Sequence, residues 1–297
     1  LLSVILSYDC ANLANEDVPL ILVHGVLANT KTLHNFEQRL RFQFPNRKIS
    51  NIEVLFGKLS TLFGLSERYI REAAFQIKQN SFGQNCIDLI GHSQGGFVSR
   101  AYIQLFDEPF PTVRNFYSIA GALNGFDCPE GSDRGGFGWM VDMMRNLAFS
   151  NFFQFAVIPS MYWRKSEDYS AFLKAKPLLA KLNKEIDSNL TNNFVKLRRF
   201  YTIYSENDDA LRPQSTANFG QLVDKDLKSY YELDFYQQDA FGLKTLDQMG
   251  VWRKCKLNQF THNSYFRKQL DEFVDDYFSL ILDLEEGEQD GISECYN

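Results

Sequence analysis

Residues 91–96 have the sequence Gly-His-Ser-Gln-Gly-Gly, a G-x-S-x-G motif between two apolar segments. Residues 86–90 are typical of a buried strand, and residues 97–106 carry apolar side chains at helical spacing. A strand that turns sharply into a helix through this motif exposes its serine oxygen above a sheet, and the glycines avoid collisions in the tight turn. The motif therefore predicts Ser93 as the nucleophile of a serine hydrolase.

A nucleophilic serine needs a base to accept its proton. The chain has four histidines, of which His92 adjoins Ser93 and cannot turn its ring toward the serine oxygen. His24 belongs to a different loop, and His34 lies at the start of an expected surface helix. In α/β-hydrolases the order along the chain is serine, acid, histidine. Only His262 lies downstream of Ser93, so we expect it to be the catalytic base.

The acid is expected at the end of a strand between Ser93 and His262. Residues 199–204 are rich in aromatic and β-branched side chains, as a strand would be, and lead into a loop with Asp208 and Asp209. A carboxylate there would orient the histidine and stabilise its protonated form. Adjacent side chains point in different directions, so only one of the two can serve. Both are also ordinary turn formers, and the residues alone leave the choice open.

An oxyanion hole is expected where an early strand ends. Residues 18–23 form an almost continuous apolar run that is followed by His-Gly-Val-Leu at 24–27. In this fold the N–H after the nucleophile, here that of Gln94, acts with an N–H from such a loop. Val26 is the expected partner and Leu27 the alternative.

Composition excludes several classes of protein. The net charge of −6 and the isoelectric point of 5.4 argue against nucleic acid or an anionic membrane as an electrostatic partner. No apolar stretch has the length of a membrane span. We expect neither a metal nor a cofactor, and a monomer. The five cysteines contain no CxxC pair, and we expect Cys86 to be a buried thiol while the pairing of the others stays open.

The alternation of strand and helix signals predicts an α/β-hydrolase fold, with a mostly parallel central sheet flanked by helices. We expect one such domain over residues 16–284, with a mainly helical lid inserted at about 122–193. Residues 1–15 are expected to be the remnant of a secretory signal with an N-terminal extension, and residues 285–297 an acidic tail.

The expected lid is rich in methionine and phenylalanine, side chains that make an adaptable wall for a hydrocarbon chain. The alternative is that they only pack the lid against the domain. The predicted acyl-binding residues are Met140, Met143, Met144, Phe152, Phe155 and Met161.

Beyond the elbow, residues 236–247 (Tyr-Gln-Gln-Asp-Ala-Phe-Gly-Leu-Lys-Thr-Leu-Asp) and the Tyr-Trp pair at 162–163, which precedes a helix, make this chain similar to the palmitoyl-protein thioesterases. The resemblance covers about residues 18–282. It implies a lysosomal or secreted enzyme that removes fatty acyl groups from S-acylated proteins or peptides. It also assigns Asp208 as the acid, Val26 to the oxyanion hole and His262 as the base.

The chain departs from the family after the Tyr-Trp pair, where Arg-Lys-Ser at 164–166 replaces the usual His-Asp-Pro.

Two other functions are alternatives to thioester hydrolysis. A carboxylester lipase would use the same three residues, and a lipid-binding protein would retain the fold without the chemistry.

Overall fold

Seven strands form one sheet in the order β2-β1-β3-β4-β5-β8-β9, and all neighbours are parallel except β9, which runs antiparallel to β8. The computed structural model describes residues 10, 13–55, 57–131, 138–190, 193–284 and 290–297. This mostly parallel order confirms the predicted α/β-hydrolase fold. The strands are β1 Leu20–Val23, β2 Ile49–Ile52, β3 Cys86–His92, β4 Thr112–Ile119, β5 Arg199–Tyr204, β8 Trp252–Lys256 and β9 Cys295–Tyr296.

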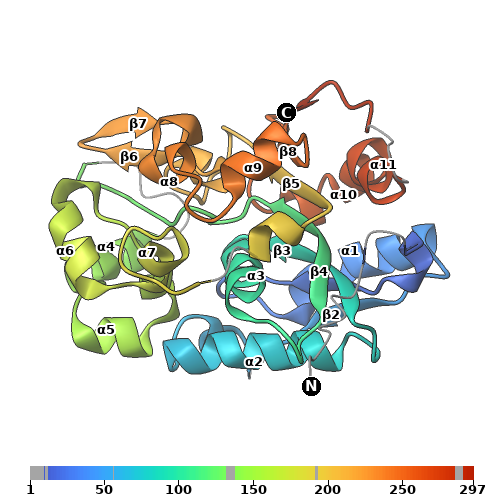
Figure 1. The fold of residues 1–297 in the computed structure, drawn as a ribbon, viewed down its shortest axis with the longest axis horizontal. Coiled ribbons are helices and arrows are strands. Elements are labelled where there is room, and N and C mark those ends of the chain that lie inside the picture. Colours follow the sequence, from blue (N-terminus) through green and yellow to red (C-terminus); the bar gives the residue numbers. More distant parts are fainter. Residues whose placement is uncertain (1–9, 11–12, 56, 132–137, 191–192, 285–289) are drawn as a thin grey trace, which may run out of the picture.

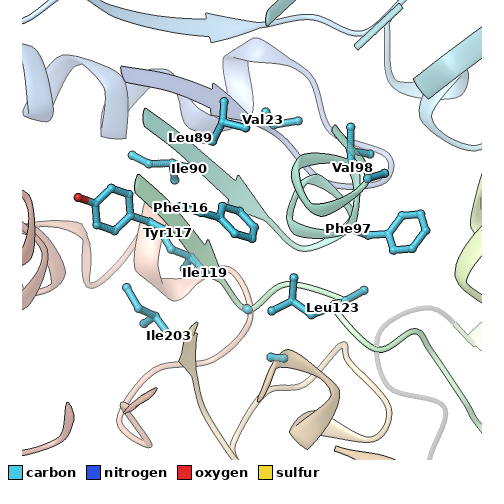
Figure 2. Close-up of a cluster of buried hydrophobic side chains, with 14 of the residues drawn as sticks. Val23, Leu89, Ile90, Phe97, Val98, Phe116, Tyr117, Ile119, Leu123 and Ile203 are labelled. Atoms are coloured by element: carbon cyan, nitrogen blue, oxygen red, sulfur yellow. The ribbon is translucent and has the colours of Figure 1, made fainter. Parts of the chain in front are cut away.

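The central strands are buried on both faces because helices cover both faces of the sheet. Every residue of β1 and β3 is buried. Figure 2 shows the core around β3 and β4, with side chains that include Leu89, Ile90, Phe116, Tyr117 and Phe97.

The flanking helices lie on the two sides of this sheet. Figure 1 shows α2 (Ser66–Gln79) and α3 (Gln94–Leu105) on one side, and α1 (Thr30–Gln43) with the C-terminal helices on the other. Helix α3 follows Ser93 directly, and its residues 94–104 are all buried. This central helix therefore fixes the position of the bend that precedes it.

The described residues between β4 and β5 form four short helices: α4 (Gly138–Leu147), α5 (Asn151–Ala156), α6 (Tyr169–Ala175) and α7 (Leu178–Leu182). A 3-10 turn, η4 (Ile158–Tyr162), follows α5. Figure 1 shows these helices gathered at one end of the molecule, beside the start of α2. They occupy the region in which the sequence predicts a helical lid.

The C-terminal third of the chain adds smaller elements around the sheet. A hairpin of β6 (Gln221–Val223) and β7 (Asp226–Lys228) lies outside the main sheet and is followed by α8 (Asp234–Gln237) and α9 (Leu243–Gln248). Residues 264–282 do not form one continuous helix. They form a 3-10 turn, α10 (Leu270–Phe273), a π turn and α11 (Ser279–Leu282).

Two disulfide bonds correct the expectations for the cysteines and the C-terminus. Cys86 is not a thiol, because it pairs with Cys10 across a sequence separation of 76 residues. Cys255 of β8 pairs with Cys295 of β9, so the last residues belong to the edge of the sheet and not to a tail. The acidic residues 285–289, the residues 1–9 of the expected signal and Thr191 of a glycosylation sequon lie outside the described residues. No helix of the described residues has the length and hydropathy of a membrane span.

Candidate active site

Ser93 occupies a strained bend between β3 and α3. Its φ is 56° and its ψ is −124°, a combination that is unfavourable for a residue with a side chain. A Cβ on Gly95 would lie 2.1 Å from the Val23 carbonyl oxygen, and one on Gly91 would lie 2.6 Å from the Gly95 carbonyl oxygen. Only glycine fits at these two positions, which explains the spacing of the motif.

Ser93, His262 and Asp208 form a hydrogen-bonded chain. Ser93 Oγ lies 2.9 Å from His262 Nε2, and His262 Nδ1 lies 2.7 Å from Asp208 Oδ2. A carboxylate can only accept hydrogen bonds, so His262 Nδ1 carries the ring proton. His262 Nε2 is therefore free of a proton and accepts a hydrogen bond from the serine hydroxyl. All three residues are buried. The structure thus brings together the serine, histidine and aspartate that the sequence singled out.

The geometry distinguishes the two candidate acids. Asp208 faces the His262 ring and also accepts hydrogen bonds from the N–H groups of Ala210 and Leu211, each at 2.8 Å. Burial raises the Asp208 pKa, but His262 and these donors outweigh burial and hold the pKa below its usual value. Asp209 is exposed and, among the described residues, accepts only from the His262 backbone N–H, at 3.1 Å.

The other histidines lie where they cannot act as the base. His34 is exposed on α1, and His24 is buried with its Nδ1 3.1 Å from the Gly25 carbonyl oxygen. His92 Nε2 donates to the His262 carbonyl oxygen at 3.0 Å. Burial, together with the nearby His262, lowers the pKa of His92 to about 3, so its ring is neutral. His92 therefore supports the backbone of the residue that faces the serine.

Backbone N–H groups of Val26 and Gln94 remain available near Ser93. Neither donates a hydrogen bond within the described part of the chain. The N–H of Leu27, the alternative candidate, donates to Thr61 Oγ1 at 2.6 Å and is therefore occupied. A Cβ on Gly25 would lie 2.8 Å from Ser93 Cβ, so this loop must approach the serine closely. The arrangement favours Val26 over Leu27 as an oxyanion donor.

The Gln94 side chain links the elements around these N–H groups. Its Nε2 donates to the Thr61 carbonyl oxygen at 3.0 Å and lies 3.3 Å from the Tyr69 hydroxyl oxygen. Its Oε1 accepts from the Tyr162 hydroxyl at 2.8 Å. Sequence analysis missed Thr61 and Tyr69, which carry no motif. Tyr162 stood out only through the family's Tyr-Trp pair.

A small cavity adjoins Ser93. Its volume is about 20 Å³, and its lining includes Val26, Met140, Pro159 and Tyr162. Such a volume has room for about one water molecule. The unoccupied space is therefore much smaller than a long acyl chain.

The predicted acyl-binding residues separate into different environments. Met140 lines the cavity. Met144 and Met161 are buried outside its lining, and Met143 is partly buried. Phe152 and Phe155 are 69 % and 60 % exposed and do not line the cavity, so their role in acyl binding stays a prediction. The two rings belong to α5, a helix of six residues with no buried side chain, and residue type alone does not reveal this exposure.

Arg164, where the chain departs from the family, connects the helical insertion to the loop after β4. It donates to the Asn124 carbonyl oxygen at 2.8 Å and pairs with Glu185 at 2.7 Å.

The described residues hold no group of three or more His, Cys, Asp or Glu side chains suited to a metal ion.

A family model described as palmitoyl protein thioesterase matches residues 19–262. The chain belongs to this family. A lysosomal thioesterase, PPT2-B, of Xenopus laevis is 28 % identical over 241 residues, which cover 78 % of this chain and 82 % of that protein. Palmitoyl-protein thioesterase 3 of Dictyostelium discoideum is 24 % identical over 236 residues, or 77 % and 80 % of the two chains.

An esterase from Exiguobacterium antarcticum superposes with a TM-score of 0.46 and 12 % identity, covering 90 % of this chain and 92 % of that structure. As a member of the palmitoyl protein thioesterase family, the chain is an enzyme of the hydrolase class.

Proposed function

We propose that this enzyme hydrolyses long-chain fatty acyl thioesters of S-acylated proteins or peptides. The observation that carries the proposal is the chain of hydrogen bonds from Ser93 Oγ through His262 to Asp208, in a member of a thioesterase family. Ser93 is the nucleophile, His262 the general base and Asp208 the residue that orients the ring. Val26 and Gln94 supply the oxyanion hole.

The reaction proceeds in two steps. In the first, Ser93 Oγ attacks the thioester carbonyl carbon while His262 Nε2 takes the hydroxyl proton, and the carbonyl oxygen becomes an oxyanion near the Val26 and Gln94 N–H groups. The C–S bond then breaks, and the leaving sulfur takes the proton from His262 and departs as a thiol. In the second step, water attacks the acyl-serine with His262 again as base, which releases the fatty acid and restores Ser93.

Acyl binding requires the walls of the cavity to move. Met140 lines the cavity beside Ser93, and its flexible thioether side chain can change rotamer without loss of apolar contact. Each buried methylene contributes about 0.8 kcal/mol, so a groove that lengthens with the substrate favours long chains steeply. We expect activity on matched acyl thioesters to rise with chain length toward palmitoyl. Equal rates on acetyl and palmitoyl thioesters, below their aggregation limits, would show that the wall does not bind the chain.

The decisive experiment compares a thioester and an oxyester with the same palmitoyl group. The three residues act on both, but a thiolate leaves without much help from an acid, so we expect the thioester to be preferred. A preference for the oxyester would make the protein a carboxylester lipase. Failure of an active-site serine probe to label the pure protein, together with no turnover, would support the alternative of a non-catalytic lipid-binding protein.

We further propose that the enzyme acts in the lysosome or after secretion. The Xenopus laevis relative is named as a lysosomal thioesterase, and disulfide bonds such as Cys10–Cys86 persist in oxidising compartments. Immunolocalisation against a lysosomal marker tests this location. The expected monomer is to be checked by analytical ultracentrifugation.

A further inference from the structure

Five large apolar side chains are exposed on two neighbouring segments. One segment joins η2 (Lys58–Thr61) to α2, and the other is α5. The exposed fractions of the five residues lie between 42 % and 69 %. We call this set the apolar rim: Leu59, Phe63, Leu65, Phe152 and Phe155.

Hydrogen bonds hold the two segments side by side. The Gly64 N–H donates to the Ala156 carbonyl oxygen at 3.0 Å, and the Ile158 N–H donates to the Leu62 carbonyl oxygen at 2.9 Å. Phe63 pairs with Val157 in an antiparallel bridge. The two segments that carry the exposed side chains therefore lie side by side. Soluble monomers rarely expose large contiguous apolar patches without a function.

The apolar rim adjoins the candidate active site through both of its segments. Thr61, two residues after Leu59, accepts from Gln94 at 3.0 Å. Pro159 and Tyr162, in the turn that follows α5, line the cavity beside Ser93. Any surface that covers the rim would therefore lie next to the cavity.

The absence of charged residues from these two segments indicates which kind of surface binds to the apolar rim. Residues 59–66 and 146–163 contain no Asp, Glu, Lys, Arg or His, although charged residues make up 23 % of the chain. Protein–protein interfaces normally include arginine and have polar groups at their edge. A surface with exposed phenylalanine and leucine and no charge matches instead the boundary between headgroups and acyl chains of a neutral bilayer. The net charge of −6 disfavours an anionic one.

We propose that the apolar rim docks the enzyme on the surface of a zwitterionic lipid bilayer. Docking would place the cavity beside Ser93 at the depth where the acyl group of an S-acylated protein resides, so the chain passes into the enzyme without crossing water. The role in acyl transfer rests on the proposed function, whereas docking itself needs no chemistry.

The test uses Ser93→Ala protein with phosphatidylcholine vesicles and measures the bound fraction by flotation. We expect Leu59→Ser/Phe63→Ser and, separately, Phe152→Ser/Phe155→Ser to lower the partition coefficient about tenfold, since apolar burial drives interfacial binding. The control is Phe42→Ser/Met249→Ser, which removes side chains that are 80 % and 66 % exposed outside the rim. It should change partitioning less than about twofold. All of these side chains are exposed, and thermal unfolding verifies that the variants are folded.

Three results would overturn the docking proposal. They are absence of vesicle binding by the Ser93→Ala parent protein, an equal loss of vesicle binding in the control variant, and concentration-dependent self-association that only the rim substitutions abolish.

With Ser93 restored, the ratio of the rate on a vesicle-embedded acyl thioester to the rate on a water-soluble one should fall about tenfold in the rim variants. Vesicle binding without turnover of any thioester would contradict the proposed function and leave docking intact.

Discussion

Gln94 Nε2 donates to the Thr61 carbonyl oxygen at 3.0 Å, which joins the residue after the nucleophile to the turn that supports the other oxyanion loop. Thr61 Oγ1 in turn accepts from the Leu27 N–H at 2.6 Å. One threonine thus contacts both loops that carry the proposed oxyanion donors. We expect the separation between the Val26 and Gln94 N–H groups to depend on Thr61, which is not hydrogen-bonded to Ser93 or His262 among the described residues.

Replacing Thr61 by Val should therefore lower kcat with little change in KM. The substitution keeps the shape of the side chain but removes the acceptor of the Leu27 N–H, and small displacements of an oxyanion donor are costly in the transition state. We expect a loss of about tenfold, less than the loss from deleting a donor outright. Steady-state kinetics on a soluble acyl thioester measures the effect. An unchanged kcat would show that the loops hold their positions without this contact.

Tyr162→Phe tests the hydrogen bond that the Gln94 side-chain oxygen accepts. It removes the hydroxyl that donates to Gln94 Oε1 at 2.8 Å and leaves that buried oxygen without its partner. The matched control is Tyr102→Phe, which removes a buried hydroxyl that donates to the Pro111 carbonyl oxygen at 2.7 Å. Both should lower the free energy of unfolding by about 1 kcal/mol, but only Tyr162→Phe should lower kcat. Equal kcat values for the two variants would make Tyr162 a packing residue.

Substitution of the nucleophile and of the base should be non-additive. Ser93→Ala and His262→Ala each break the same proton transfer, because the two side chains are joined at 2.9 Å. We expect each to reduce turnover by several orders of magnitude and the double variant to be scarcely worse. Single-turnover assays with active-site titration provide the measurement. More than about a tenth of the wild-type rate in Ser93→Ala would refute the assignment of the nucleophile.

Substitution of Asp208 should lower kcat far more than substitution of the adjacent Asp209. Asp208→Asn replaces the carboxylate that accepts from His262 Nδ1 and should lower kcat by about 10³–10⁴ through the wrong tautomer and the loss of charge. Asp209→Asn is the matched control, because this exposed side chain accepts from the His262 backbone N–H and does not face the His262 ring. A larger loss in Asp209→Asn would reverse the assignment of the acid while leaving Ser93 and His262 in place.

His92 should make the protein less stable in acid. Burial lowers its pKa to about 3, whereas a histidine in the unfolded chain titrates near 6.5. Between these values the unfolded chain binds a proton that the folded protein excludes. The free energy of unfolding therefore falls as the pH drops below about 6.5, with His92 contributing about 1.4 kcal/mol per pH unit.

His92→Gln removes this titration and should flatten the dependence of unfolding on pH between 6.5 and 4. Urea denaturation at several pH values measures the slope, and His34→Gln, which replaces an exposed histidine, serves as the control. An identical slope in His92→Gln and wild type would mean that His92 binds a proton in the folded protein.

Sequence alone was sufficient for the features that depend on local chain geometry. The glycines around Ser93 predict the bend because a Cβ at Gly95 or Gly91 would lie only 2.1 or 2.6 Å from a backbone carbonyl oxygen, and the apolar runs on either side predict β3 and α3. His262 followed by elimination, since a single histidine lies after Ser93. The mostly parallel sheet followed from alternating strand and helix signals, which are also local.

Only the tertiary structure shows which of two neighbouring side chains faces the site and which distant residues pair. Asp208 and Asp209 are equivalent as residue types, the resemblance to the thioesterases pointed to Asp208, and the structure places Asp208 Oδ2 2.7 Å from His262 Nδ1. The bond from Cys10 to Cys86 spans 76 residues, and the contact of Thr61 with Gln94 spans 33. The outward orientation of Phe152 likewise depends on what packs beneath its helix. Such relationships are set by packing between segments, and no periodicity within one segment encodes them.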